Sequence, residues 1–101
     1  MEAMERIKLM EACLDQAVSA INGLSDALEK YSEAESAIQK LSEYLGSEEW
    51  FNDREADSAG NLPDDLKRGV LSEDGIWNAL DDSRQLNIHM LEVATDFLKG
   101  N

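Results

Sequence analysis

A repeat of apolar side chains runs through the first third of this chain and constrains its fold more than any other feature. The apolar residues follow one another at alternating intervals of three and four. They are Ile7, Met10, Leu14, Ala17, Ile21, Leu24, Leu28 and Tyr31. These intervals bring side chains to one face of an α-helix, and no strand-like alternation competes with them. Every position of a coiled-coil seam is therefore filled across this stretch.

The dipeptide Asn22-Gly23 lies inside the repeat, where a turn would shift the phase of the apolar positions. The phase continues unchanged, so we predict one helix over about residues 3–45 that ends near Gly46. A glycine inside a helix costs about 1 kcal/mol relative to alanine, and a break at Asn22-Gly23 is the alternative. The spacing 28–31–34 then places two intervals of three together, which turns the apolar stripe after Tyr31 to a new direction.

Two further helices have clear start signals. Ser47 is followed by two glutamates, which is typical of a capped helix start and predicts a short middle helix over about residues 48–58. Ser72 is followed in the same way by two acidic residues, and it predicts a last helix over about residues 73–99. The fold class is therefore all-α, and we expect one helical domain over residues 1–101.

The lengths of these helices lead to an expectation about assembly. At 1.5 Å per residue, the helix over 3–45 is about 65 Å long and the helix over 73–99 is about 40 Å long. The last helix cannot cover the first, and an amphipathic helix does not leave a filled apolar seam in water. We therefore predict a helical bundle formed by a homodimer along the Ile7–Tyr31 seam. A break at Asn22-Gly23 would instead permit a compact monomer of four helices.

The charge balance bears on the class of partner. The chain carries 22 acidic and 9 basic residues and a formal net charge of −13, which repels nucleic acid and anionic lipid. We therefore expect neither a nucleic-acid nor a membrane partner. The only cysteine, Cys13, cannot form an internal disulfide, and the first residues lack the apolar run of a signal peptide. Both features favour a cytoplasmic protein.

The residues that carry catalytic chemistry are scarce. Cys13 and His89 are the only members of their types, and no phosphate-binding loop or nucleophile motif is present. We predict no enzyme, no catalytic residue and no cofactor. The acidic segment 53–64 resembles a calcium loop, but Ser58 and Asp64 stand where such a loop needs a glycine and a bidentate glutamate. We therefore predict no metal site.

A polar cluster around the middle helix is the candidate interaction site. Its members are Trp50, Asp53, Asp57, Arg68, Arg84 and Asn87. Arg84 and Asn87 interrupt the apolar face of the last helix, and a guanidinium buried there requires a partner. In a structural interpretation, Arg68 or Arg84 clamps the middle helix through one of the two aspartates. In a functional interpretation, the cluster binds an anionic ligand or a partner's carboxylate.

The two tryptophans each follow a helix start by a few residues. We predict that Trp50 and Trp77 lie in the core and fix these starts. An exposed tryptophan would instead serve as an interface anchor.

Three quoted segments carry a resemblance: "ERIKLMEACLD", "YLGSEEW" and "DREADSAGNLPDDLKRGVLSEDGIWNAL". The chain resembles a family of small, acidic, helical bacterial proteins that is known as a domain of unknown function. The resemblance implies an intracellular bacterial protein, and it implies no reaction, cofactor or partner. Within the motif "LKRGVLSEDGIW" we predict a joint, in which Gly69 permits a turn, Val70 and Leu71 anchor it, and Ser72 caps the last helix.

These observations favour a non-enzymatic module for protein–protein interaction that self-associates. One alternative is an acidic decoy that binds a basic protein. A second alternative is a binder of a small anion or a metal that uses the polar residues between 53 and 84.

Overall fold

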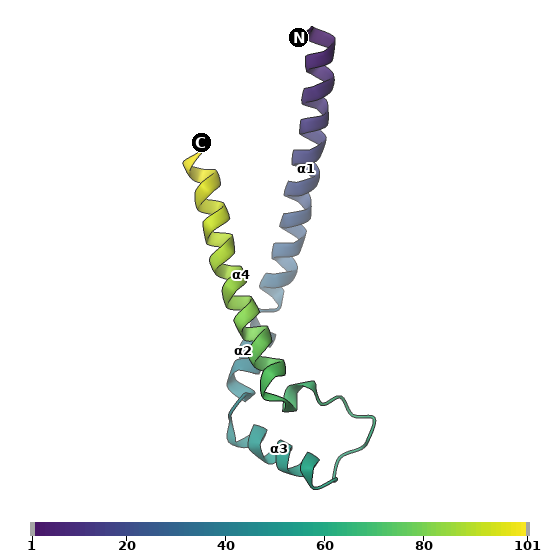
Figure 1. Ribbon diagram of the computed structural model, residues 1–101, viewed down its shortest axis with the longest axis vertical. Helices are drawn as coiled ribbons and strands as arrows, with labels where there is room; N and C mark the ends of the chain where they lie inside the picture. Colours follow the sequence, from purple (N-terminus) through teal and green to yellow (C-terminus); the bar gives the residue numbers. More distant parts are fainter. Residues whose placement is uncertain (1, 101) are drawn as a thin grey trace. The chain divides into compact units, whose positions relative to one another are not determined.

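The computed structural model describes residues 2–100, which form helices and no strand. In chain order the elements are α1 (Ala3–Glu33), α2 (Glu35–Tyr44), α3 (Glu48–Ser58), the 3-10 turn η1 (Gly69–Leu71) and α4 (Glu73–Lys99), as Figure 1 shows. The all-α prediction is confirmed. The predicted middle and last helices match α3 and α4 at both ends.

The first predicted helix passes through Asn22-Gly23 without a break. It is interrupted instead at Ala34, so the helix expected over 3–45 is two helices separated by one residue. The N–H of Ala34 donates to the carbonyls of Lys30 and Tyr31 at 3.2 and 3.1 Å, a shared bond that is common at helix ends. The interruption falls where successive intervals of three disturb the apolar repeat. After α2 the chain turns at Gly46, whose φ of 79° favours glycine.

The chain divides into two units within α2, after residue 36. In the first unit, no residue of α1 is buried. The large aliphatic residues of its repeat are exposed, with Leu28 at 41% and Ile21 at 66% as the extremes. The prediction of a single domain over residues 1–101 stays a prediction.

The second unit begins at residue 37 and has a small core around Trp50 and Ile76, which are 3% and 2% exposed. Trp50 lies in α3 and Ile76 lies in α4, and η1 contacts both helices. A long loop carries the chain from the end of α3 back to η1 (Figure 1). η1 therefore connects the two helices that hold the core.

Both predicted helix caps are present. The hydroxyl of Ser47 accepts a hydrogen bond from the backbone N–H of Trp50 at 3.1 Å, and that of Ser72 accepts one from Gly75 at 3.0 Å. Each cap satisfies a backbone donor that the first turn of a helix leaves without an intrahelical partner. The starts of α3 and α4 are thus fixed by short-range chemistry.

Gly75 permits the close approach of η1 to the first turn of α4. A Cβ at this position would stand 2.3 Å from the carbonyl oxygen of Gly69 and 3.0 Å from the hydroxyl of Ser72. Both atoms belong to the motif that the sequence predicts as a joint. The joint therefore depends on the absence of a side chain at Gly75 as well as on the cap.

No helix among residues 2–100 has the length and hydropathy that crossing a membrane requires.

Candidate functional site

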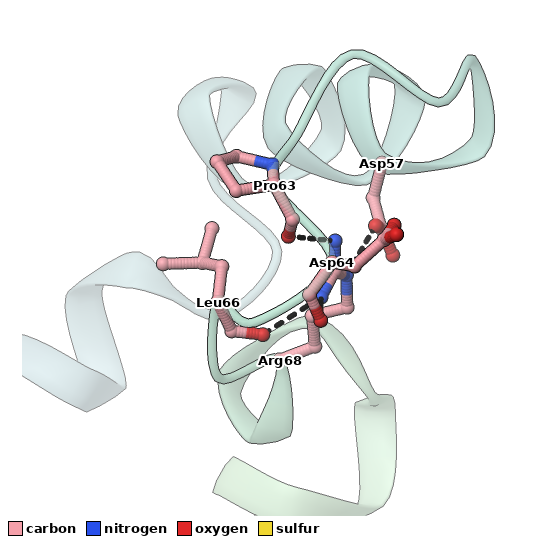
Figure 2. A network of polar contacts seen from close by, with 5 residues as sticks. All are labelled: Asp57, Pro63, Asp64, Leu66 and Arg68. Carbon is pink, nitrogen blue, oxygen red and sulfur yellow. Dashed lines mark hydrogen bonds and ion pairs between the residues drawn. The ribbon is translucent and has the colours of Figure 1, made fainter.

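Arg68 is the centre of a network that holds the loop between α3 and η1 (Figure 2). Its Nε donates to a carboxylate oxygen of Asp57 at 2.5 Å. Its Nη1 donates to the carbonyls of Leu66 at 2.7 Å and Asp64 at 3.3 Å, and its Nη2 donates to that of Pro63 at 2.6 Å. One guanidinium therefore joins the end of α3 to three carbonyls of the loop.

The geometry of Arg68 bears on what this group can bind. A guanidinium has five N–H groups on three nitrogens, and all three nitrogens of Arg68 donate, in four hydrogen bonds. Asp57 is the carboxylate that Arg68 holds, as the structural interpretation expected. The contact with Asp57 is through Nε alone, because the two Nη atoms turn to the loop carbonyls. The arrangement serves to satisfy the carbonyls of a loop that has no helix of its own.

Trp50 is held on several sides. Its indole Nε1 donates to the carbonyl of Val70 at 2.9 Å, which ties α3 to η1. The guanidinium carbon of Arg54 stands 4.7 Å from the centre of a Trp50 ring, at a distance that suits a cation–π contact. Phe51 meets Trp50 edge to face, with ring centres 5.1 Å apart. The prediction that Trp50 lies in the core is confirmed.

Asp53 has a partner that the sequence did not suggest. The hydroxyl of Tyr44, at the end of α2, donates to its carboxylate at 2.6 Å. This hydrogen bond, with smaller contributions from burial and from the charges of Asp53 and Glu49, raises the pKa of Tyr44 to about 12. The bond stabilises the protonated phenol because only that form can donate.

Arg84 and Asn87 lie on α4, and both side chains are exposed. Within residues 2–100, Arg84 has no hydrogen-bond or ion-pair partner, so it does not clamp Asp53 or Asp57. The six predicted residues thus divide into separate groups. Asp57 lies with Arg68, Asp53 with Tyr44, and Trp50 with Val70.

Trp77 lies beside an open hollow in the second unit. The hollow has a volume of about 540 Å³ and is lined by Leu45, Gly46, Trp50, Glu73, Asp74 and Trp77. Trp77 is 57% exposed, so the prediction that it lies in the core is wrong. It stands on the outer side of the first turns of α4, whereas the adjacent Ile76 points into the core. The hollow therefore combines an aromatic wall with two carboxylates.

The described residues contain no group of three His, Cys, Asp or Glu side chains that is placed to hold a metal ion. The acids of the segment that resembles a calcium loop are used differently. Asp57 binds Arg68, and Asp64 contributes its backbone carbonyl to the same guanidinium.

Three residues of these contacts were missed from the sequence. Arg54 follows Trp50 by one helical turn, and this spacing is a signal that could have identified the ring contact. Tyr44 and Asp53 lie on different helices, and their pairing depends on the turn at Gly46. The need for glycine at position 75 cannot be predicted from its neighbours in the sequence, because the carbonyl that a side chain there would contact belongs to η1.

Comparison with protein families shows what the chain is similar to. The model of a family described as a domain of unknown function, DUF4298, matches residues 7–93. The matched range includes the apolar repeat of α1, the Arg68 network and the joint before α4. No curated protein and no solved structure matches the chain.

Proposed function

The chain belongs to the DUF4298 family, and we propose that it is a non-enzymatic interaction module that assembles with a second copy of itself. The observation that carries this proposal is the apolar seam of α1, from Ile7 to Tyr31, whose large aliphatic side chains are exposed. The family brings no reaction that the chain would have to perform. The proposal therefore depends on the physical chemistry of α1.

An exposed apolar seam of this kind requires a packing partner that removes its side chains from water. α1 has 31 residues and none of them is buried. Helices in water gain most of their stability from packing an apolar face, and contiguous apolar surface of this extent marks an interaction site. An apolar repeat over four heptads is the pattern of one helix that packs along another.

The positions beside the seam suit a second copy of this acidic chain. They are Arg6, Cys13, Ala20 and Ala27 on one side and Glu11, Val18, Ser25 and Ser32 on the other. Only Arg6 and Glu11 are charged, and their charges are opposite. The remaining acids of α1, such as Asp15 and Asp26, lie on faces that point away from the seam. Two copies can therefore pair along α1 without facing carboxylates, despite the net charge of −13.

A charge placed in the seam tests the proposal. Leu14→Glu or Ile21→Glu would bury an unpaired carboxylate in the pair and should raise the dissociation constant of the dimer about tenfold or more. Ser19→Glu is the matched control, because it adds the same charge on the opposite face of α1 and should leave the dimer intact. Light scattering measures the mass. A dissociation constant that is unchanged in both seam variants would contradict the proposal.

A second candidate function, the capture of a basic protein, is supported by one feature. Glu73 and Asp74 stand at the rim of the hollow beside the exposed Trp77. A lysine or arginine of a partner would meet both carboxylate and aromatic surface there. Binding of a lysine-rich peptide that disappears on Trp77→Ala and weakens with salt would support this candidate.

Binding of a small anion or metal through the polar cluster stays a prediction. The engagement of Arg68 by four acceptors supports a structural role for this residue instead.

We also propose a bacterial origin and a cytoplasmic location. The free, exposed Cys13 is compatible with a reducing compartment.

A further inference from the structure

The outer face of α4 also has the intervals of a seam, but polar residues stand at its centre. Stepping by three and four from Trp77, the positions are Trp77, Leu80, Arg84, Asn87, Leu91, Ala94 and Leu98. Trp77, Leu91 and Leu98 are 57%, 70% and 74% exposed. Arg84, Asn87 and Ala94 are exposed as well. This face, which we call the α4 seam, therefore has its apolar residues at both ends and its polar residues between them.

The α4 seam is complementary to itself when it is reversed. In an antiparallel pair of helices, the two kinds of seam position face each other. With a two-fold axis between Gln85 and Leu86, Trp77 faces Ala94 of the second copy, and Leu80 faces Leu91 of the second copy. The largest side chain of the seam is thus opposite its smallest, as close packing requires.

The polar centre fits the same arrangement. Arg84 faces Asn87 of the second copy, so a guanidinium, which only donates, meets an amide oxygen, which accepts. Asp81 lies one turn before Arg84 on the same side of the helix and brings a carboxylate near it. Asp81 already accepts a hydrogen bond from Gln85 at 2.6 Å, which holds it beside the centre of the seam.

A parallel arrangement is disfavoured by the same residues. It would place Arg84 directly opposite Arg84 of the second copy, and two like charges at a seam position are expensive to bury. It would also place the two Trp77 side chains opposite each other and the two Ala94 side chains opposite each other. The antiparallel arrangement avoids this mismatch. At the positions that flank the seam, it brings Asp74 and Asp81 beside Thr95 and Ile88 of the second copy.

We propose that α4 pairs with α4 of a second copy in the antiparallel direction, about a two-fold axis between Gln85 and Leu86. Trp77 is the anchor of this interface, which accounts for a large aromatic side chain left exposed beside the core. The polar centre fixes the register, because any shift along the helix separates Arg84 from Asn87. The interface uses no residue of the α1 seam and goes beyond the function proposed above.

Disulfide trapping tests the direction and the register. In a Cys13→Ser background, Leu80→Cys and Leu91→Cys variants are mixed and oxidised. Facing seam positions lie within the Cα separation that a disulfide spans, about 4.4–6.8 Å. We expect a disulfide between Leu80→Cys and Leu91→Cys chains and none within either variant alone, because equal positions stand eleven residues apart along the axis, about 16 Å.

The control for random collision is Asn78→Cys, which lies outside the seam, and its yield sets the background. Disulfides that form within each single variant would mean a parallel pair and would overturn the proposal. A mixed yield no higher than that of Asn78→Cys would overturn it as well. A chain that stays monomeric at every protein concentration would also overturn the proposal. The α4 seam would then be covered by another part of the same chain.

A swap of side-chain size gives a second, independent test. Ala94→Trp places two tryptophans against each other and should raise the dissociation constant of the dimer about tenfold or more. Trp77→Ala combined with Ala94→Trp exchanges the large and small partners and should return the constant to within about threefold of the original. A double variant that is no tighter than Ala94→Trp alone would contradict the pairing.

The same trapping experiment separates this inference from the α1 proposal. If the α1 seam is not an interface, Leu14→Glu leaves the mass unchanged while the Leu80→Cys and Leu91→Cys disulfide still forms. If the α4 pairing is wrong, that disulfide is missing while Leu14→Glu still dissociates the dimer.

Discussion

The two units of this chain obtain order in opposite ways. α1 has a regular repeat of apolar side chains, no buried residue and no cap from a side chain. In the second unit, the segment from the end of α2 to the first turn of α4 has no such repeat, but its turns are fixed by specific contacts of Trp50, Arg68 and Ser72. In α1 a regular apolar repeat is thus left exposed. In the second unit, by contrast, the turns before α4 are fixed by hydrogen bonds and packing within the chain.

This difference separates two sources of stability. Local contacts act at any protein concentration, because both partners belong to the same chain. A seam that is covered by a second copy stabilises the chain by mass action, so its contribution grows with concentration. The contrast between the units can therefore be tested by comparing variants at several concentrations.

The largest effect is expected from Trp50→Ala. The change removes a side chain that is 3% exposed together with its hydrogen bond to Val70, and it should cost about 3–5 kcal/mol of unfolding free energy. Urea denaturation measures the loss. The loss should be the same at all protein concentrations, whereas that of Leu24→Ala in the α1 seam should change with concentration. A concentration-dependent loss for Trp50→Ala would remove the distinction between the units.

Two glycine substitutions form a matched pair, and we expect each to change the stability of the protein by an intermediate amount. Gly75→Ala would place a Cβ 2.3 Å from the carbonyl of Gly69 and should destabilise the protein by about 2 kcal/mol, because backbone must shift. Gly23→Ala meets open space inside α1 and should stabilise it by up to about 1 kcal/mol. Melting temperatures that move in the same direction for both variants would argue against the close approach at the joint.

Arg68→Ala should cost about 1–2 kcal/mol, because it breaks the contact with Asp57 and frees three loop carbonyls on a partly exposed surface. Arg68→Lys should recover little, since an ammonium cannot reproduce the planar set of donors. The adjacent Lys67→Ala is the control and should change stability by less than about 0.5 kcal/mol. Hydrogen exchange should show faster opening of residues 59–68 in both Arg68 variants; equal effects from Lys67→Ala would refute the role of the network.

The smallest effect concerns Tyr44, which becomes the only tyrosine in a Tyr31→Phe variant. Tyrosinate absorbance should then titrate near pH 12 in the folded protein and near pH 10 in urea. Since folding raises this pKa, the stabilisation is complete below about pH 10 and is lost as the pH rises to about 12. A folded-state value near 10, or one that Asp53→Asn leaves unchanged, would mean that the hydrogen bond to Asp53 is absent in solution.

Several elements follow from sequence because their causes are local. The repeat of α1 fixes a helix through Asn22-Gly23, and a serine followed by acids fixes the starts of α3 and α4. Membership of an uncharacterised family of unknown function was also expected from the quoted motifs, and the match to the DUF4298 family agrees with it. These signals depend only on neighbours within one or two helical turns.

The remaining features depend on contacts between elements. The interruption at Ala34 follows from a change of the apolar stripe that predicts a new direction but not a break. The choice of Arg68 rather than Arg84 as the clamp depends on how the loop after α3 returns, and the exposure of Trp77 depends on which side of α4 faces η1. Spacing along the chain specifies none of these three-dimensional relations.

The most direct test of the central claim is the mass of the unmodified chain over a wide range of concentration. Sedimentation equilibrium or light scattering should give twice the chain mass of 11.3 kDa at micromolar concentration and dissociation only on dilution. Dissociation should be accompanied by a loss of helical signal, because α1 has no other cover in its own unit. A mass of one chain at every concentration, with full helical content, would contradict the account.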